Sequence, residues 1–366
     1  MTGNTRPSVS LVLTVKDEAE SLPSLLSSIA AQRMPPDEIV VVDGGSRDRT
    51  VEILREWATR LPLRILELPG SSIARGRNTA LQHARGALVA VTDGGVVLAP
   101  DWLERLIAPF LALEVRAQPD VVSGFFRAAP QTLFEFALGV TTLPDADEIQ
   151  PARFLPSSRS VALRRSWFVA GIRYPEWLDY CEDVVFDLRL RRAGARFQFC
   201  PDAVVWFRPR PSVRAFWDQY YRYARGDGKA GLFTSRHLIR YATYLIFIPL
   251  VLVTRNHGLM LAAGVGALTY LCRPIRRLWR RRSEVGVRQV MVAVVLIPLL
   301  RLVGDLAKMA GYPVGVAWRV RRYGVRSTWR TIPELISSAD AGAPAAAAPA
   351  EEIRPPRGWS SGGSRW

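Results

Sequence analysis

The feature that most constrains the fold is the alternation of short β-branched runs with helix-length segments through the first 127 residues. Runs with the length and composition of buried strands lie at residues 9–15, 38–43, 64–68, 88–92 and 121–127. Segments with apolar residues at helical spacing lie between them, at residues 22–32, 48–60, 73–84 and 101–113. Strands that alternate with helices of this length predict an α/β fold with a mainly parallel, doubly wound sheet.

Acidic residues stand at or just beyond the ends of three predicted strands: Asp17, Asp43 and Asp93. In open parallel sheets, ligands bind outside the carboxyl ends of the strands. An aspartate before glycines, as in VVDGG, is also a common turn former. The recurrence at three strand ends favours a ligand site over three unrelated turns.

Later segments complete the organisation of the chain. Residues 139–158 contain Pro and Asp and are interpreted as a mobile loop, and residues 179–193 as a helix. Two short strands are expected at 197–200 and 204–207. An aromatic helix at 212–223 then runs into ARGDGKAG, which is interpreted as a glycine-flexed loop.

The positive charge is concentrated in the C-terminal third. The net charge is +16; residues 1–236 carry 30 Lys/Arg against 27 Asp/Glu, whereas residues 237–366 carry 19 against 6. This placement disfavours a nucleic-acid partner and favours an anionic membrane surface. The three cysteines and three histidines show neither a disulfide framework nor metal-ligand spacing.

Three apolar runs follow residue 236, at 241–254, 258–272 and 289–300. Each is shorter than the roughly 20 residues of a spanning helix, but flanking arginines can extend the first two by snorkelling. The loop at 273–288 holds seven arginines and one glutamate, which indicates a cytoplasmic location. We therefore expect the protein at the cell membrane with its N-terminal domain on the cytoplasmic face; a soluble helical subdomain is the alternative.

The third apolar run differs because Arg301, Asp305 and Lys308 follow it closely. It is interpreted as re-entrant, interfacial or a broken pair of helices. The expected domains are therefore an α/β domain at 1–235, a transmembrane or interfacial helical region at 236–336, and a disordered, low-complexity tail at 337–366.

Several motifs in order resemble family 2 glycosyltransferases, whose catalytic domain has the GT-A fold. VSLVLTVKDEAE supplies the apolar strand and acidic pair, and EIVVVDGGSRDRT supplies the Asp-x-Gly-Ser-x-Asp-x-Thr motif. The resemblance covers roughly residues 8–235. It implies that Asp17, Glu18 and Asp43 contact the base and ribose of a nucleotide sugar linked to UDP, GDP or dTDP.

SSIARGRNTALQ resembles the Ala-Arg-Asn segment that precedes the metal motif of the family. By this resemblance Arg75, Arg77 and Asn78 belong to the nucleotide-sugar site. The first turn of a helix combines its dipole with guanidinium groups, which suits a diphosphate. Exposed arginines without a ligand are the alternative.

Asp93 matches the first aspartate of the family's Asp-x-Asp metal motif, but Gly95 stands at the second. The resemblance implies a Mg²⁺ or Mn²⁺ ion, with Asp93 as its ligand. Because half of the motif is missing, two solutions remain. A hydrated Mg²⁺ can be held largely by the substrate's phosphates, or arginines such as Arg75, Arg77 and Arg222 can shield the leaving group.

The segment ending in WLDYCEDVVF resembles the acceptor region of the family. It places Asp183 at the position of the catalytic base and Glu182 beside it. One carboxylate is sufficient for an inverting transferase, because only the acceptor hydroxyl must lose a proton. Two acidic residues at a helix start are otherwise explained by the helix dipole.

QYYRY at 219–223 resembles the Gln-x-x-Arg-Trp motif of membrane polysaccharide synthases, with Tyr223 in place of tryptophan. The resemblance assigns Gln219, Arg222 and Tyr223 to the acceptor and diphosphate. An aromatic helix packed in a core is the alternative.

Together these patterns predict an inverting hexosyltransferase that acts on a lipid-linked or cell-envelope saccharide acceptor. Two rival functions are a degenerate, membrane-anchored GT-A scaffold and a nucleotidyltransferase on a related fold. The scaffold is suggested by Gly95, whereas the nucleotidyltransferase lacks an early glycine-rich phosphate loop.

Overall fold

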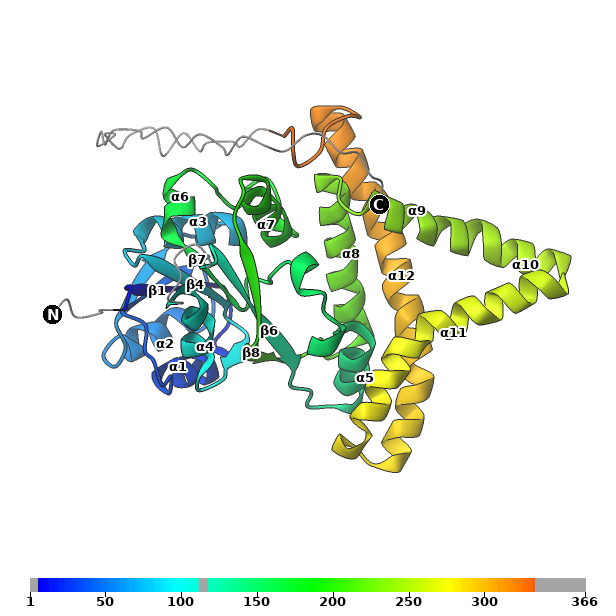
Figure 1. The fold of residues 1–366 in the computed structure, drawn as a ribbon, viewed down its shortest axis with the longest axis horizontal. Helices are drawn as coiled ribbons and strands as arrows, with labels where there is room; N and C mark the ends of the chain where they lie inside the picture. The colour runs from blue at the N-terminus through cyan, green and yellow to red at the C-terminus, as the bar shows by residue number, and fades with distance from the viewer. Residues whose placement is uncertain (1–5, 112–117, 333–366) are drawn as a thin grey trace. The chain divides into compact units, whose positions relative to one another are not determined.

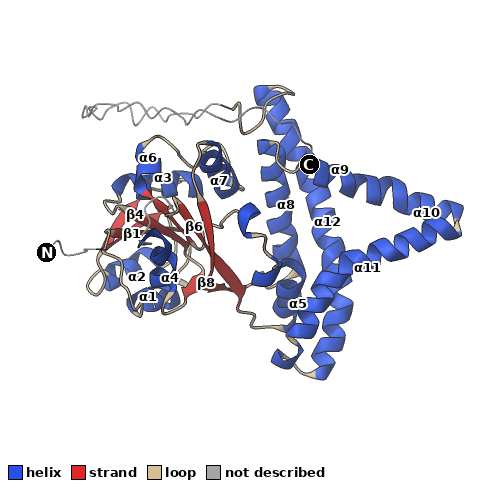
Figure 2. Cartoon of the chain, viewed as in Figure 1, coloured by secondary structure: helices blue, strands red, loops and turns tan. Residues whose placement is uncertain are grey.

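The computed structural model describes residues 6–111 and 118–332. Its centre is one eight-stranded sheet (Figures 1 and 2). The strands are, in sheet order, β3 (Leu63–Glu67), β2 (Glu38–Asp43), β1 (Val9–Val15), β4 (Leu88–Asp93), β7 (Val161–Arg164), β6 (Val121–Ala128), β8 (Phe197–Phe207) and β5 (Val96–Leu98). Only β7 and β5 run against the other six, so the mainly parallel sheet predicted from the sequence is confirmed.

Helices cover both faces of the sheet, because successive side chains of a strand point to opposite sides. One face packs against α1 (Leu22–Ala30), α2 (Thr50–Trp57) and α4 (Trp102–Ile107). The other face packs against α3 (Ile73–His83), α6 (Arg165–Val169) and α7 (Glu182–Arg192). In β1, Leu11 and Leu13 enter the first core and Val12 enters the second. The doubly covered sheet explains why its central strands are apolar on both faces.

A helical region follows the sheet in the chain. Its elements are α8 (Val213–Ala230), α9 (Thr234–Tyr241), a π-helical segment (Ala242–Phe247), α10 (Ile248–Thr254), α11 (His257–Arg280) and α12 (Val287–Tyr323). The 37-residue helix α12 lies along α8 (Figure 1). Its first half also packs against α5 (Leu133–Thr142) in an apolar cluster.

Three helical runs are long and apolar enough to cross a membrane: Thr234–Thr254, His257–Arg280 and Val287–Tyr323. In the first two, 6% of the most apolar window is buried in the protein, against 33% in the third. The first two therefore form a hairpin with exposed apolar sides, whereas α12 has one face on the protein. α12 is continuous, so the predicted broken pair of helices is wrong, although Pro298 and Pro313 lie within it.

Glycines of α8 explain a second error in the sequence interpretation. ARGDGKAG is not a loop, because α8 continues through it to Ala230. A Cβ on Gly226 would lie 2.6 Å from the Tyr180 carbonyl oxygen, and one on Gly228 would lie 2.3 Å from that of Tyr312. Glycine is needed here because neighbouring backbones approach closely, not because the chain must bend.

The remaining differences concern short elements. β5 and β7 were not predicted, and the two strands expected at 197–207 are one, β8, whose pairing with β6 is irregular between Ser123 and Phe125. The loop predicted at 139–158 begins as the last turn of α5 and contains short 3₁₀ turns at Ala146–Glu148 and Pro151–Arg153. The predicted tail at 337–366 lies outside the described residues.

Candidate active site

The loops after β1 and β2 lock together through their acidic and hydroxyl side chains. Asp17, with a positive φ of 54°, accepts from the backbone N–H of Arg47 at 2.7 Å, and its own N–H donates to the Ser46 hydroxyl at 2.8 Å. Asp48 accepts from the N–H of Ala19 at 3.0 Å. The motif residues of both loops therefore build one rigid rim at the carboxyl edge of the sheet.

Asp43 lies at the same edge, but its carboxylate is hydrogen-bonded within its own turn. Its carboxylate accepts from the backbone N–H groups of Gly45 and Ser46 at 2.9 and 3.0 Å, and the side chain is buried. The turn-forming role, which was the alternative to ligand binding for this aspartate, is therefore present in the structure. The contact of Asp43 with a nucleotide stays a prediction.

Arg77 joins two carboxylates from distant parts of the chain. Its Nη2 lies 2.6 Å from Oδ1 of Asp93, at the end of β4, and its Nη1 lies 2.6 Å from Oε1 of Glu182, at the start of α7. The guanidinium is 3% exposed and lies over the Tyr174 ring. Two short ion pairs and burial make Arg77 an internal bridge in this structure, whereas the sequence suggested a diphosphate ligand on a helix surface.

The two carboxylates of the bridge have pKa values shifted in opposite directions. Burial alone would raise the pKa of Asp93, but Arg77 and Arg159 outweigh it and hold this pKa below its usual range. Burial, reinforced by the Asp183 carboxylate, raises the pKa of Glu182 to about 7 despite the opposing effect of Arg77. Asp93 therefore carries the charge that balances Arg77, and Glu182 titrates near neutral pH.

Arg159 is a site residue that the sequence analysis missed. Its Nε lies 3.8 Å from Oδ2 of Asp93, its guanidinium interacts with the Tyr223 hydroxyl, and the more distant Asp183 carboxylate acts on it electrostatically. It also lies over the Phe207 ring at 4.8 Å. In an arginine-rich chain, no local pattern distinguishes this loop arginine from the exposed ones.

Asp183 differs from its neighbours in having an uncommitted carboxylate. It is half-buried at the first turn of α7, and one oxygen accepts from the following N–H, of Val184, at 2.8 Å. Among the described residues, no basic nitrogen lies within ion-pair distance of it. Glu182, in contrast, is buried and bound to Arg77. The pair thus combines one structural and one available carboxylate.

Asn78 and Arg75 have different environments on α3. The Asn78 side chain accepts from the Tyr174 N–H and donates to the Tyr174 carbonyl, both at 2.9 Å, so the protein itself engages the amide. The Arg75 side chain is exposed, and its backbone N–H is capped by the Ser72 hydroxyl. Asn78 positions the chain before α7, and its role in nucleotide-sugar binding is untested.

Of the three α8 residues predicted to contact the acceptor and diphosphate, Gln219 and Tyr223 belong to one hydrogen-bonded group. Gln219 Nε2 donates to the Tyr223 hydroxyl at 3.0 Å, and that hydroxyl also interacts with Arg159. Arg222 donates to the Tyr180 hydroxyl at 2.9 Å, beside the start of α7. The QYYRY segment therefore contacts the Asp93 network and the loop that carries Asp183.

The donor groups around Asp93 do not form a metal site. Its two oxygens face Arg77 and Arg159, and two guanidinium groups repel a divalent cation. Gly95 adds no ligand, and a Cβ built there would have Glu18 Oε2 at 3.7 Å, but that carboxylate is hydrogen-bonded to Ser21. Within residues 6–111 and 118–332, no three His, Cys, Asp or Glu side chains cluster as metal ligands. The Mg²⁺ or Mn²⁺ ligand role of Asp93 therefore stays a prediction, and the two guanidinium groups oppose it.

Comparison with known proteins identifies the family. The glycosyl transferase family 2 profile matches residues 10–159. The glycosyltransferase AglE of Haloferax volcanii is 39% identical over 222 residues, which span 57% of this chain and 69% of AglE. The chain belongs to glycosyltransferase family 2. This family 2 chain is also 24% identical over 220 residues to EpsJ, an uncharacterized glycosyltransferase of Bacillus subtilis, spanning 56% of this chain and 62% of EpsJ.

Further matches extend the comparison. TarS, a poly(ribitol-phosphate) β-N-acetylglucosaminyltransferase of Staphylococcus aureus, is 25% identical over 209 residues, spanning 54% of the family 2 chain and 35% of TarS. The mannosyltransferase PcManGT of Pyrobaculum calidifontis, solved with GDP-Man and Mn²⁺, superposes with a TM-score of 0.52 at 19% identity, covering 86% of this chain and 87% of PcManGT. This superposition supports the GT-A fold.

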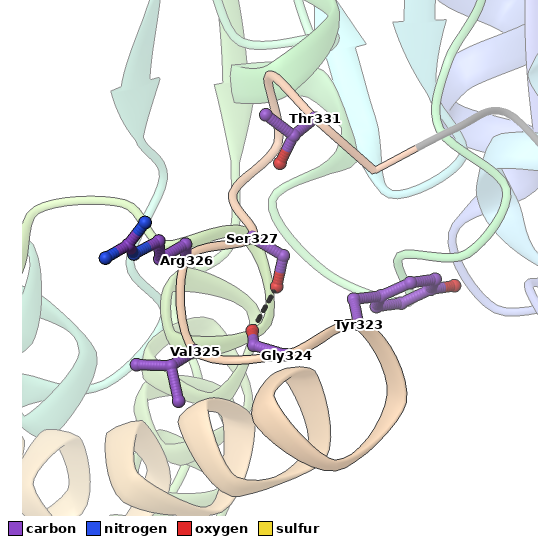
Figure 3. Close-up of a pocket in the computed structure, with 6 residues that line it drawn as sticks. All are labelled: Tyr323, Gly324, Val325, Arg326, Ser327 and Thr331. Atoms are coloured by element: carbon purple, nitrogen blue, oxygen red, sulfur yellow. Dashed lines mark hydrogen bonds between the residues drawn. The ribbon is translucent and has the colours of Figure 1, made fainter.

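A separate hollow of about 510 Å³ lies at the end of α12 (Figure 3). Its lining residues are Tyr323, Gly324, Val325, Arg326, Ser327 and Thr331. The Ser327 hydroxyl donates to the Gly324 carbonyl at 2.6 Å. None of the residues predicted for nucleotide, acceptor or catalysis lines this hollow, so it is distinct from the candidate active site.

Proposed function

We propose that the protein is an inverting glycosyltransferase that moves a hexosyl unit from a nucleotide sugar to a hydroxyl group of a lipid-linked or cell-envelope saccharide. The observation that carries this proposal is the available Asp183 carboxylate beside the Arg77–Asp93–Glu182 bridge. Asp183 accepts the acceptor's proton while the acceptor oxygen attacks the anomeric carbon. The bond from that carbon to the nucleotide's phosphate oxygen breaks on the opposite face, which inverts the configuration.

The leaving nucleoside diphosphate needs positive charge, which the chain's own arginines supply in this proposal. Arg75 and Arg222 have exposed side chains, and Arg159 lies between Asp93 and Tyr223. Guanidinium groups bind phosphate oxygens through paired hydrogen bonds. Asp17, Glu18 and Asp43 form the nucleotide side of the site, and Tyr223 lies beneath the acceptor sugar.

The acceptor class is supported by a relative and by the helical region. TarS is named for transfer to poly(ribitol-phosphate), a polymeric acceptor. The exposed apolar sides of the hairpin suit a membrane, and the basic segment at 273–288 suits its cytoplasmic face. We propose that the catalytic domain faces the cytoplasm, close to lipid-linked acceptors.

The test is a panel of UDP-, GDP- and dTDP-linked sugars incubated with the purified protein and a membrane lipid extract, with products detected by mass spectrometry. We expect Asp183→Asn to reduce transfer at least 100-fold while UDP or GDP still raises the melting temperature. Asp202→Asn, at an exposed position on β8, is the matched control. Nucleotide stabilisation without transfer by the wild-type protein would favour the scaffold. Transfer by Asp183→Asn at the wild-type rate would refute Asp183 as the base.

A further inference from the structure

A group of charged side chains lies at the base of the apolar hairpin. Asp305 of α12 is 5% exposed and accepts from three donors: Arg240 Nε at 2.8 Å, the Tyr244 hydroxyl at 3.0 Å and the Tyr270 hydroxyl at 2.6 Å. These donors come from α9, the π-helical segment and α11. Asp305 therefore ties both arms of the hairpin to α12.

Two further cations, Arg301 and Lys308, lie on the same face of α12. They are placed four residues before and three residues after Asp305, which aligns them along the helix. Arg301 lies over the Tyr270 ring at 4.6 Å, and Lys308 over the Tyr220 ring at 4.7 Å. Neither has a carboxylate within ion-pair distance in the described chain, and the buried Arg301 Nε has no hydrogen-bond partner.

The charges of the group around Asp305 indicate that an anionic partner would bind here. Asp305 is paired with Arg240, and the nearby Asp227 is hydrogen-bonded to His237 at 3.1 Å. Arg301 and Lys308 remain as two positive charges in segments that are otherwise apolar enough for a membrane. Ionisable groups in such segments are costly unless they bind a partner, so they mark functional sites.

The surroundings show that this partner has an apolar part. Leu245, Ile246, Leu268 and Leu302 expose 41–72% of their surface around this base. A ligand that reaches Arg301 beside the half-exposed Tyr270 therefore also contacts exposed aliphatic side chains. This combination suits a lipid whose charged group enters between the helices.

We infer that Arg301 and Lys308 bind the phosphomonoester headgroup of a membrane lipid at the base of the hairpin. The inference rests on the proposed function, because it places an anionic lipid beside the residues predicted to bind the acceptor. A phosphomonoester approaches two negative charges, which matches two cations that have no ion-pair partner among the described residues, whereas a phosphodiester has one. The Tyr220 ring under Lys308 contacts the Tyr223 ring at 6.0 Å, so the site adjoins the predicted acceptor residues.

The test measures lipid binding by the full chain in phosphatidylcholine nanodiscs. The probes are phosphatidic acid, a phosphomonoester, and phosphatidylglycerol, a phosphodiester. We expect phosphatidic acid to bind at least tenfold more tightly, and Arg301→Gln/Lys308→Gln to abolish this preference. The control is Arg255→Gln/Arg288→Gln, which removes the same charge at the exposed hairpin tip and at the exposed start of α12. It should retain the preference.

Equal binding of the two lipids by the wild-type protein, or an unchanged preference in Arg301→Gln/Lys308→Gln, would overturn the inference. Millimolar inorganic phosphate should not displace phosphatidic acid; full displacement would assign the site to free phosphate instead. If the double variant does not fold, Lys308→Met is the substitute, because an unbranched side chain can still pack on the Tyr220 ring. This variant should weaken phosphatidic acid binding, because it removes one positive charge. Asp183→Asn should bind phosphatidic acid normally, which separates failure of this site from failure of the proposed chemistry.

Discussion

Replacing Arg77 by methionine tests whether the buried bridge holds the candidate site together. The substitution keeps an unbranched side chain on α3 but removes both ion pairs, to Asp93 and Glu182. The Arg77 side chain is 3% exposed and that of Glu182 is 8% exposed, so water cannot readily replace the lost partner. We therefore expect a large loss of stability.

The size of the effect follows from the geometry. Breaking a buried ion pair by removing one partner costs about 3–5 kcal/mol, because it leaves uncompensated charge. With an unfolding entropy of about 2.1 cal/mol/K per residue over roughly 320 residues, this loss lowers the melting temperature by about 4–7 °C. Arg75→Met, two residues earlier on the exposed face of α3, should change the free energy of unfolding by less than about 0.5 kcal/mol.

The assay is thermal unfolding of the detergent-purified protein, followed by circular dichroism. A second substitution, Asp93→Asn, made in the Arg77→Met background should recover part of the loss, because Asp93 carries the charge that balances Arg77. Equal melting temperatures of Arg77→Met and Arg75→Met would refute the bridge as a stabilising element. So would a double variant less stable than Arg77→Met alone.

Three further predictions address packing, titration and metal dependence. Gly228→Ala should lower the free energy of unfolding by about 1–3 kcal/mol, because its Cβ would lie 2.3 Å from a backbone oxygen, whereas Gly264→Ala, with open space around it, should not. The pKa of Glu182 is raised from 4.5 to about 7, so its contribution is complete below pH 4.5 and is lost as the pH rises to about 7. The wild-type melting temperature should therefore fall from pH 5 to pH 7 more steeply than that of Glu182→Gln. Because arginines face Asp93, EDTA should change transfer less than twofold, and a tenfold loss restored by Mg²⁺ would contradict this expectation.

The sheet was predictable because its signals are local. Buried parallel strands are continuous apolar runs, and the boundaries of β1 and β2 agree with the sequence interpretation. β5 and β7 have three and four residues, and runs this short have no diagnostic periodicity. The continuation of α8 was missed because glycine breaks helices by propensity, and only the neighbouring backbone explains its presence.

The candidate site was predictable in its members but not in their contacts. The resemblance to family 2 named Arg77, Asp93 and Glu182, but the sequence offers no sign that Arg77 binds both carboxylates, the second of them 105 positions away. The same limit applies to Arg159, whose position in the site depends on long-range folding. Sequence motifs name residue types, whereas pairing decides which carboxylate is available for chemistry.

The packing of α12 connects the helical region to the candidate active site. Tyr312 of α12 stacks on His237 at 3.9 Å, and His237 is hydrogen-bonded to Asp227 of α8. Asp227 accepts from the Cys181 thiol, which directly precedes Glu182 and Asp183. This chain of contacts connects α12 to the turn that carries the proposed base. The predicted division at residue 235 therefore passes through a packed interface, and the helices that follow it support the geometry of the candidate active site.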